Sequence, residues 1–506
     1  MDSDEFEKYK QGIINIESKY EDYAFKTVKN IEFLDGTKFD EYYLKIFNSG
    51  DEFNIDRNKY RTPLQVERDR IIHSSLFQRL AHKTQLFTSE KASLTENRLT
   101  HTLKVSQVAR SIARGLGLNE DLVEVIALAH DIGHPPFAHV GELALQEWIK
   151  EKIGESRKEE GSLPYKSDAR GEISKLVLAY IKPELRDSAD LYFTFGNDPG
   201  EELFMHGRQG FRLLLYKRKI EHREFLRFSK PVMYGIWRHS TKNFATDASF
   251  QYSKEIQLVE DNKLVKKIIK LAGKENVTLE ACVVRYADDI SWIVSDLEEA
   301  IHNNILKADS IRQIVGEAVR NSTLGDRLKG TINSNHINVS ELYNILISDI
   351  IKTSLKELKE SASNSKIKFS SDIQNLFDEL KKVIQDNLHK AYYVARGSMV
   401  NKARIKALCN WYFENPDEFI KEMENMQKNP EFPIQIPITD KKSEYFSDNE
   451  IYKDLIKGKG KSKGKSKGKS KADMVYKVVA ITDFVGCLTD EEVYKLSETV
   501  PIHESL

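Results

Sequence analysis

Histidine and acidic side chains are concentrated in one short stretch of this chain. His130 and Asp131 are adjacent, and His134, His139 and Glu142 follow closely. A glycine and two prolines among them predict a turn. A lone His-Asp pair is more often a hydrogen-bonded core histidine beside a solvated acid. The density of the cluster favours a site instead, because imidazole and carboxylate groups together can bind a divalent metal.

Two helices are expected to position this cluster. The first carries His101 and ends at the Gly-Leu-Gly of residues 115–117, and the second begins at the N-cap Asn119. Antiparallel helices joined by so short a turn would bring His101 alongside His130 and Asp131. The apolar residues that define them are Leu103, Val105, Val108 and Ile112, then Val125, Ile126, Leu128 and Ala129.

A distant segment, residues 279–301, offers a further ligand. It has an apolar helical pattern and carries Asp288, Asp289 and Asp296. Asp288, Trp292 and Asp296 are spaced i, i+4, i+8 and therefore line one helix face. The alternative is an exposed acidic face, against which the apolar flanks argue.

The order of His101, His130 with Asp131, and Asp288 is similar to the H…HD…D signature of the HD superfamily. More narrowly, the chain resembles the deoxyguanosinetriphosphate triphosphohydrolases, and more distantly the mammalian SAM- and HD-domain dNTP triphosphohydrolase. The blocks that carry the resemblance are residues 61–87, 97–105, 130–142 and 287–300, with a weaker one at 481–494. The resemblance implies an all-α, mostly helical fold, an HD-domain phosphohydrolase core with added helical regions.

The same resemblance implies a reaction and its residues. The metal, manganese or magnesium, would be bound by His101, His130, Asp131 and Asp288. Hydrolysis of dGTP or another dNTP at the α-phosphorus would release the deoxynucleoside and intact tripolyphosphate. His139 and Glu142 would form the catalytic pair, in which His139 protonates the departing 5′-oxygen. The positions that match substrate contacts are Gln85, Arg98, His134, His206, Arg238, Trp292 and Asp296.

Some positions depart from the family pattern. Trp292 stands where a tyrosine usually packs under the deoxyribose, and Arg238 where a phosphate-binding lysine is usual. Residues 204–210 keep His206 but differ from the family motif at Met205, Gly207 and Arg208. These changes leave base and sugar preference open more than they affect the hydrolysis.

The chain is expected to divide into successive regions: a lead-in (1–55), the HD phosphohydrolase core (56–310), a helical region (311–440), a flexible Lys/Gly/Ser-rich loop (441–473) and a C-terminal helical segment packed on the core (474–506). The tract from Lys457 to Lys471 has no apolar residue with which to offset its ordering entropy. Its GKS triplets lack the glycine spacing and the preceding strand of a phosphate-binding P-loop.

Composition restricts the remaining classes. Of 506 residues, 40% are hydrophobic and 31% charged, as in soluble globular proteins, and the net charge is −1. The acidic start lacks the features of a signal peptide and three scattered cysteines suggest a reducing compartment, so the cytoplasm is expected.

Two other functions stay open. One is an HD phosphohydrolase that acts on another nucleotide. The other is a nucleic-acid-binding regulatory protein with a degenerate HD site, whose lysine tract would bind single-stranded DNA by counterion release. By analogy with the family, a homo-oligomer, a hexamer or tetramer, is expected.

Overall fold

The computed structural model describes residues 3–22, 24–31, 38–40, 61–85, 96–158, 204–220, 228–239, 278–303, 305–307, 309–311, 332–333, 336–360, 367–388, 392–428, 432 and 468–500. Helices make up nearly all of these residues. The strands among them are β1 (Ile332–Asn333) and β2 (His336–Ile337), an antiparallel pair with Ile332 opposite Ile337. The all-α class expected from the sequence is confirmed.

The helices of the described residues fall into three groups along the chain. The first includes α1 (Ser3–Glu17), α2 (Thr27–Asn30), α5 (Pro63–Ile72), α6 (Ser75–Gln78), η1 (Arg79–His82), α7 (Arg98–Leu116), α8 (Glu120–Ala129) and α9 (Ala138–Lys158). The second includes α12 (His206–Ile220), α13 (Lys230–Arg238), α15 (Leu279–His302), α18 (Val339–Glu360), α19 (Ser371–Val383) and η3 (Ile384–Leu388). The third includes α20 (Tyr392–Glu414), α21 (Pro416–Gln427), α23 (Gly468–Cys487) and α24 (Asp490–Thr499).

Helices α7 and α8 form where local signals predict them. Gly117 ends α7 with a φ of 67°, the left-handed conformation that glycine adopts without steric cost. The Asn119 side chain then accepts hydrogen bonds from the first backbone N–H groups of α8. Leu103 is an exception, because its side chain is 52% exposed while Val105 and Val108 are buried. The assignment of Leu103 to the apolar face was wrong.

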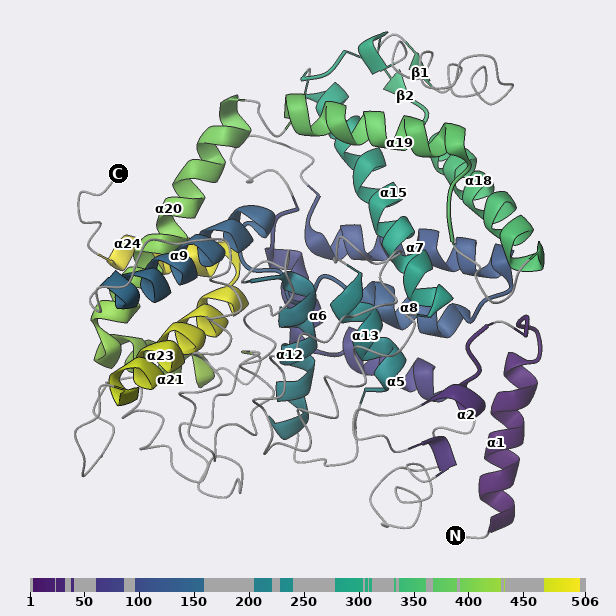
Figure 1. Ribbon diagram of the computed structural model, residues 1–506, viewed down its shortest axis with the longest axis horizontal. Helices are drawn as coiled ribbons and strands as arrows, with labels where there is room; N and C mark the ends of the chain where they lie inside the picture. Colours follow the sequence, from purple (N-terminus) through teal and green to yellow (C-terminus); the bar gives the residue numbers. More distant parts are fainter. Residues whose placement is uncertain are drawn as a thin grey trace.

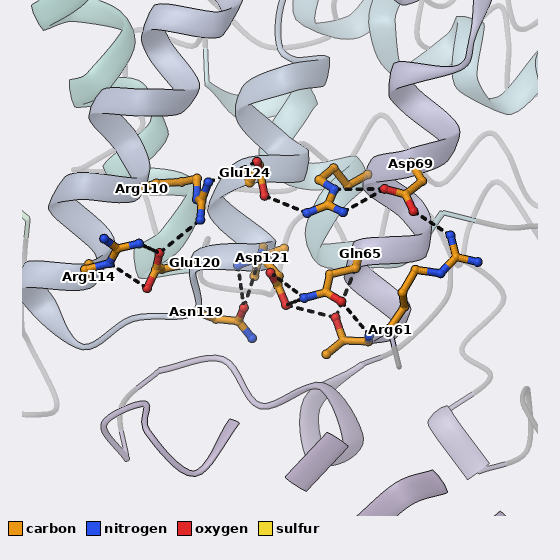
Figure 2. Close-up of polar contacts among 12 residues, drawn as sticks. Arg61, Gln65, Asp69, Arg110, Arg114, Asn119, Glu120, Asp121 and Glu124 are labelled. Carbon is orange, nitrogen blue, oxygen red and sulfur yellow. Dashed lines mark hydrogen bonds and ion pairs between the residues drawn. The ribbon is translucent and has the colours of Figure 1, made fainter. Parts of the chain in front are cut away.

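Polar contacts fix the first turn of α8 between its neighbours α5 and α7 (Figure 2). The carboxylate of Asp121 accepts hydrogen bonds from Thr62 Oγ1 (3.0 Å) and Gln65 Nε2 (3.0 Å) of the α5 start. Arg68 of α5 pairs with Glu124 at 3.2 Å, and Arg114 of α7 pairs with Glu120 at 2.7 Å. The end of α8, where His130 follows, is therefore held at a fixed place.

Helix α15 crosses α7 and α8, while α9, α20, α23 and α24 form a second group on the other side of the molecule (Figure 1). The buried Trp148 of α9 joins this group, donating its indole N–H to Asn410 Oδ1 of α20 at 2.9 Å. In α18 the side chains of Leu342, Ile345, Leu346 and Ile350 are buried, and their spacing places them on one face of the helix.

The C-terminal region begins earlier than residue 474. Helix α23 starts at Gly468, so the end of the basic tract is helical, whereas residues 441–467 lie outside the described residues. The three cysteines are free thiols. Among the described helices, none combines the length and apolar character that crossing a membrane requires.

Candidate active site

Three helices bring together the four residues expected to bind a metal. His101 lies on α7, His130 directly follows α8, and their ring centroids are 5.8 Å apart. Asp288 of α15 places its Oδ1 3.0 Å from His101 Nε2 and 3.7 Å from His130 Nε2. Asp131 Oδ1 lies 3.4 Å from the same nitrogen of His130. All four side chains therefore converge on one volume.

The donor set fits a divalent cation. The Nδ1–H of His130 donates to the Ala127 carbonyl at 2.6 Å, and the buried Nε2 has no hydrogen-bond partner among the residues that the structure describes. Metal-binding histidines show this pattern, since the bond on one nitrogen aims the other. Burial lowers the pKa of His130, but Asp131 and Asp288 outweigh it and raise that pKa to about 9. The carboxylates therefore supply a negative charge that a cation would balance.

His139 and Glu142 meet at the start of α9. His139 Nδ1 donates to Glu142 Oε2 at 2.8 Å; the His139 side chain is 77% exposed and that of Glu142 11%. Desolvation lowers the pKa of His139, and the Glu142 carboxylate raises it by more, so the net direction is upward. The pair can thus present a proton on Nε2 to a bound molecule.

An unusual backbone turn precedes this pair. Phe137 and Ala138 have φ values of 59° and 57°, a left-handed conformation that costs energy outside glycine. The N–H of Phe137 donates to Asp490 Oδ1 at 2.9 Å, and the other oxygen of Asp490 accepts from Thr84 N at 2.9 Å. The C-terminal helix α24 therefore supports the turn that positions His139.

Two residues expected to contact phosphate lie against Asp131. Arg98 Nη1 donates to Asp131 Oδ2 at 2.6 Å, and His134 Nε2 donates to Asp131 Oδ1 at 3.1 Å. Arg98 and His134 are buried. Their cationic and N–H groups thus border the same volume as the four converging side chains.

The remaining expected substrate residues have diverse surroundings. Asp296 is buried, and burial with the nearby charges of Glu299 and Glu96 raises its pKa well above the usual value. Gln85 has a buried side-chain oxygen to which no group in the described part of the chain donates a hydrogen bond. The guanidinium of Arg238 lies 5.4 Å from the ring centroid of Trp237.

Trp292 takes part in a different contact. Its indole N–H donates to Asp289 Oδ1 at 3.1 Å, and Lys381 pairs with the same oxygen at 2.8 Å. Asp289, which the sequence left as an alternative ligand, is therefore engaged by these two side chains, whereas Asp288 faces the histidines.

His206 lies beside the His139–Glu142 pair and faces His239, a residue that the sequence analysis did not single out. The backbone N–H and Nδ1 of His206 contact Glu142 Oε1 at 2.7 and 2.9 Å, and its ring stacks on His134 with centroids 3.7 Å apart. His239 Nε2 lies 3.0 Å from His206 Nε2. His239 directly follows the apolar helix α13, just as His130 directly follows α8. This similarity is the sequence feature from which His239 could have been identified.

Gly133 allows this approach of α12. A Cβ at position 133 would lie 2.0 Å from the His206 carbonyl oxygen and 2.2 Å from Gly210 N. Only a residue without a side chain leaves room for the backbone of α12 here, so Gly133 sets the distance between His206 and the His130–Glu142 segment.

Comparison with known proteins agrees with this geometry. Residues 98–293 match the HD domain family. The chain is 30% identical over 362 residues to a "Deoxyguanosinetriphosphate triphosphohydrolase-like protein" of Desulfatibacillum aliphaticivorans, covering 71% of this chain and 76% of that protein. A protein of the same name from Rickettsia prowazekii is 30% identical over 318 residues, 63% of this chain and 67% of the relative. A protein of the same name from Jannaschia sp. is 59% identical over 90 residues, which are 18% of this chain and 23% of the relative.

Proposed function

This chain belongs to the deoxyguanosinetriphosphate triphosphohydrolase-like family of HD-domain proteins, and on that basis we propose that it hydrolyses dGTP, and other dNTPs, to deoxynucleoside and tripolyphosphate. The observation that carries the proposal is the convergence of His101, His130, Asp131 and Asp288 beside the His139–Glu142 pair. Metal-assisted hydrolysis of a phosphate ester uses a set of ligands for a divalent cation beside a proton donor.

A divalent cation, manganese or magnesium, would be held by the two imidazoles and two carboxylates. When bound, it supplies charge that stabilises a phosphoryl transition state and acidifies water. Of the two, manganese is the better match to the two imidazoles, because carboxylate, carbonyl and water oxygens are the usual ligands of magnesium.

The residues around this set have defined tasks in the proposed reaction. Arg98 and His134 would bind the phosphate oxygens, exchanging part of their present contact with Asp131 for the substrate. As a water oxygen bonds to the α-phosphorus and the bond from the α-phosphorus to the 5′-oxygen breaks, His139 Nε2–H would give its proton to the 5′-oxygen. The proton lost by the water would then restore Nε2–H. Glu142 holds the Nδ1–H of His139 and so keeps the ring oriented toward the substrate.

The sugar would lie near Gln85, Trp292 and Asp296. The buried Asp296 has a raised pKa, which favours the protonated carboxyl, and this group would exchange hydrogen bonds with the 3′-hydroxyl. Trp292 offers a flat ring but no hydroxyl. The base preference for guanine rests on the family alone.

Product analysis tests the proposal. The purified chain is incubated with each dNTP and manganese, and products are resolved by ³¹P NMR and chromatography. Nucleoside with tripolyphosphate is expected, and dGTP should be consumed fastest. Monophosphate with pyrophosphate, or no dNTP turnover, would refute it.

A second candidate is an HD phosphohydrolase for a different nucleotide. Trp292 favours it, because its indole N–H donates to Asp289 and the ring has no hydroxyl for the 3′-oxygen. Turnover of a ribonucleotide or a cyclic nucleotide above that of any dNTP would select this candidate.

By family analogy the active form would be a cytoplasmic homo-oligomer, a hexamer or tetramer. Light scattering on the full chain would measure its mass. Salt-dependent retention of single-stranded DNA would test whether the lysine tract binds nucleic acid.

A further inference from the structure

Trp292 is held by two charged side chains that have no task in the proposed reaction. Its indole N–H donates to Asp289 Oδ1 at 3.1 Å, and Lys381 Nζ of α19 donates to the same oxygen at 2.8 Å. The Lys381 ammonium also lies 5.6 Å from the ring centroid of Trp292. Asp289, Trp292 and Lys381 therefore form a closed set of three contacts between α15 and α19.

The face of α15 that carries Trp292 is the face of the candidate active site. Asp288, four residues before Trp292, faces the histidines of the cation set, and Asp296, four residues after it, is buried. Residues at this spacing share one helix face. The ring therefore lies on that face between Asp288 and Asp296, where the sugar of a nucleotide would lie in the proposed function.

Aromatic packing holds Lys381 in place on α19. Phe377, one turn before it, is buried, and its ring centroid is 5.0 Å from the Lys381 ammonium. The ring of Phe369 packs against Phe377 and against Tyr286 of α15, with centroid distances of 5.0 and 5.3 Å. The π-helical turn η3, which directly follows α19, also packs against α15. The position of the ammonium relative to Trp292 is therefore set by contacts on both sides.

An indole without these contacts could take more than one orientation. The torsion that turns an aromatic ring about its Cβ–Cγ bond has broad, roughly two-fold preferences. A hydrogen bond to a carboxylate selects one of them, and charge-assisted hydrogen bonds are the stronger class. Lys381 fixes the accepting oxygen and attracts the ring through its charge, so its loss would release the indole. The ion pair itself is partly exposed, with side chains 29% and 22% accessible, so its loss should change stability little.

We infer that Lys381 is a positioning residue, which holds the Trp292 ring against the substrate sugar and thereby sets the preference for a deoxyribose over a ribose. The inference rests on the proposed function for its substrate. A flat ring packed against the sugar gives a 2′-hydroxyl no hydrogen-bond partner, and a buried hydroxyl without a partner is unfavourable. Apolar pockets reject an added hydroxyl by about 10²-fold. A ring that is free to turn aside would leave the hydroxyl accessible to water.

Specificity measurements on the full chain test this role. The ratio of kcat/KM for dGTP to that for GTP is measured with manganese for the unsubstituted chain and for Lys381→Met, which keeps the length of the side chain and removes its charge. A ratio of about 10² in the unsubstituted chain and a fall of about tenfold in Lys381→Met are expected. Lys381→Arg should retain most of the preference, because a guanidinium can bond to Asp289 and stack on the indole. Lys382→Met, at the exposed neighbouring position, is the matched control and should leave the ratio unchanged.

A direct measurement on the ring separates this inference from the proposed function. The chain is labelled with fluorinated tryptophan, and the fluorine resonance of Trp292 is assigned with Trp292→Phe. That resonance should shift in Lys381→Met and stay in place in Lys382→Met. An unchanged resonance, or a folded Lys381→Met protein with an unchanged nucleotide ratio, would overturn the positioning role. Absence of dNTP turnover in the unsubstituted chain would overturn the proposed function and the role in sugar choice, whereas the resonance alone decides whether Lys381 holds the ring.

Discussion

Replacing Glu142 with glutamine would keep the imidazole of His139 but remove the acceptor that orients it. The variant therefore tests whether activity depends on the orientation of the His139 ring. Glu142 Oε2 accepts from His139 Nδ1 at 2.8 Å, while Oε1 accepts from the backbone and ring N–H groups of His206 at 2.7 and 2.9 Å. A glutamine has one acceptor oxygen, so its NH₂ group must face one of these donors. With two donors on one side, the oxygen should stay at His206 and the NH₂ should face His139.

The expected loss follows from that geometry. A hydrogen bond to a charged acceptor contributes about 1.5–3 kcal/mol, and its loss frees the ring to turn or to change tautomer. General acid catalysis by a positioned side chain contributes about 10²–10⁴-fold. Glu142→Gln should therefore lower kcat for dGTP by about 10²-fold or more, with a smaller change in KM.

The assay is steady-state dGTP hydrolysis with manganese, together with a thermal melt of each variant. His139→Asn should lower kcat similarly, and the double variant should be little worse than either single one, because the two residues act as a unit. Glu147→Gln is the matched control, since Glu147 lies on the same helix and makes a partly buried ion pair with Lys402 of α20 instead of contacting His139. A folded Glu142→Gln protein with a kcat near that of the unsubstituted chain would refute the reasoning.

Three further substitutions test the supporting structure. Burial raises the pKa of Glu67 to about 7, so ionisation of this carboxyl destabilises the fold by up to roughly 3 kcal/mol as pH rises from about 4.5 through 7. The Tm of Glu67→Gln relative to that of the unsubstituted chain should therefore increase between about pH 5 and pH 8. A Tm difference that stays constant across that range would contradict this prediction. Gly133→Ala would press a methyl group against the α12 backbone and should cost about 3 kcal/mol by chemical denaturation. Gly12→Ala should be neutral or stabilising, because no atom of the described residues lies within 4 Å of the added Cβ. Asp490→Ala removes the acceptor for Phe137 N and Thr84 N and should lower both Tm and kcat, while Glu491→Ala at the exposed neighbouring position should change neither.

Features set by neighbouring residues were predictable from the sequence. The N-cap at Asn119, the left-handed Gly117 and the position of His130 at the end of an apolar helix follow from local rules. Leu103 shows the limit of such rules. Residues two positions apart in a helix point to nearly opposite sides, so Leu103 does not share the face of Val105. Its 52% exposure reflects that rotation.

Contacts between distant segments were not predictable from the residues alone. Asp490 joins Thr84 and Phe137 across hundreds of residues, and Glu67 accepts from Ser229 of the α13 start. His239 was missed because a single histidine in an apolar helix usually has a structural role, and only packing against His206 and His130 distinguishes it. Spacing in sequence carries no information on such tertiary neighbours.

The most direct test of the central claim is an anomalous-difference map from crystals of the full chain grown with manganese, recorded at the manganese absorption edge. We expect a peak bounded by His101, His130, Asp131 and Asp288. Absence of a peak among these four side chains, in crystals of a protein that hydrolyses dGTP with manganese, would contradict the claim.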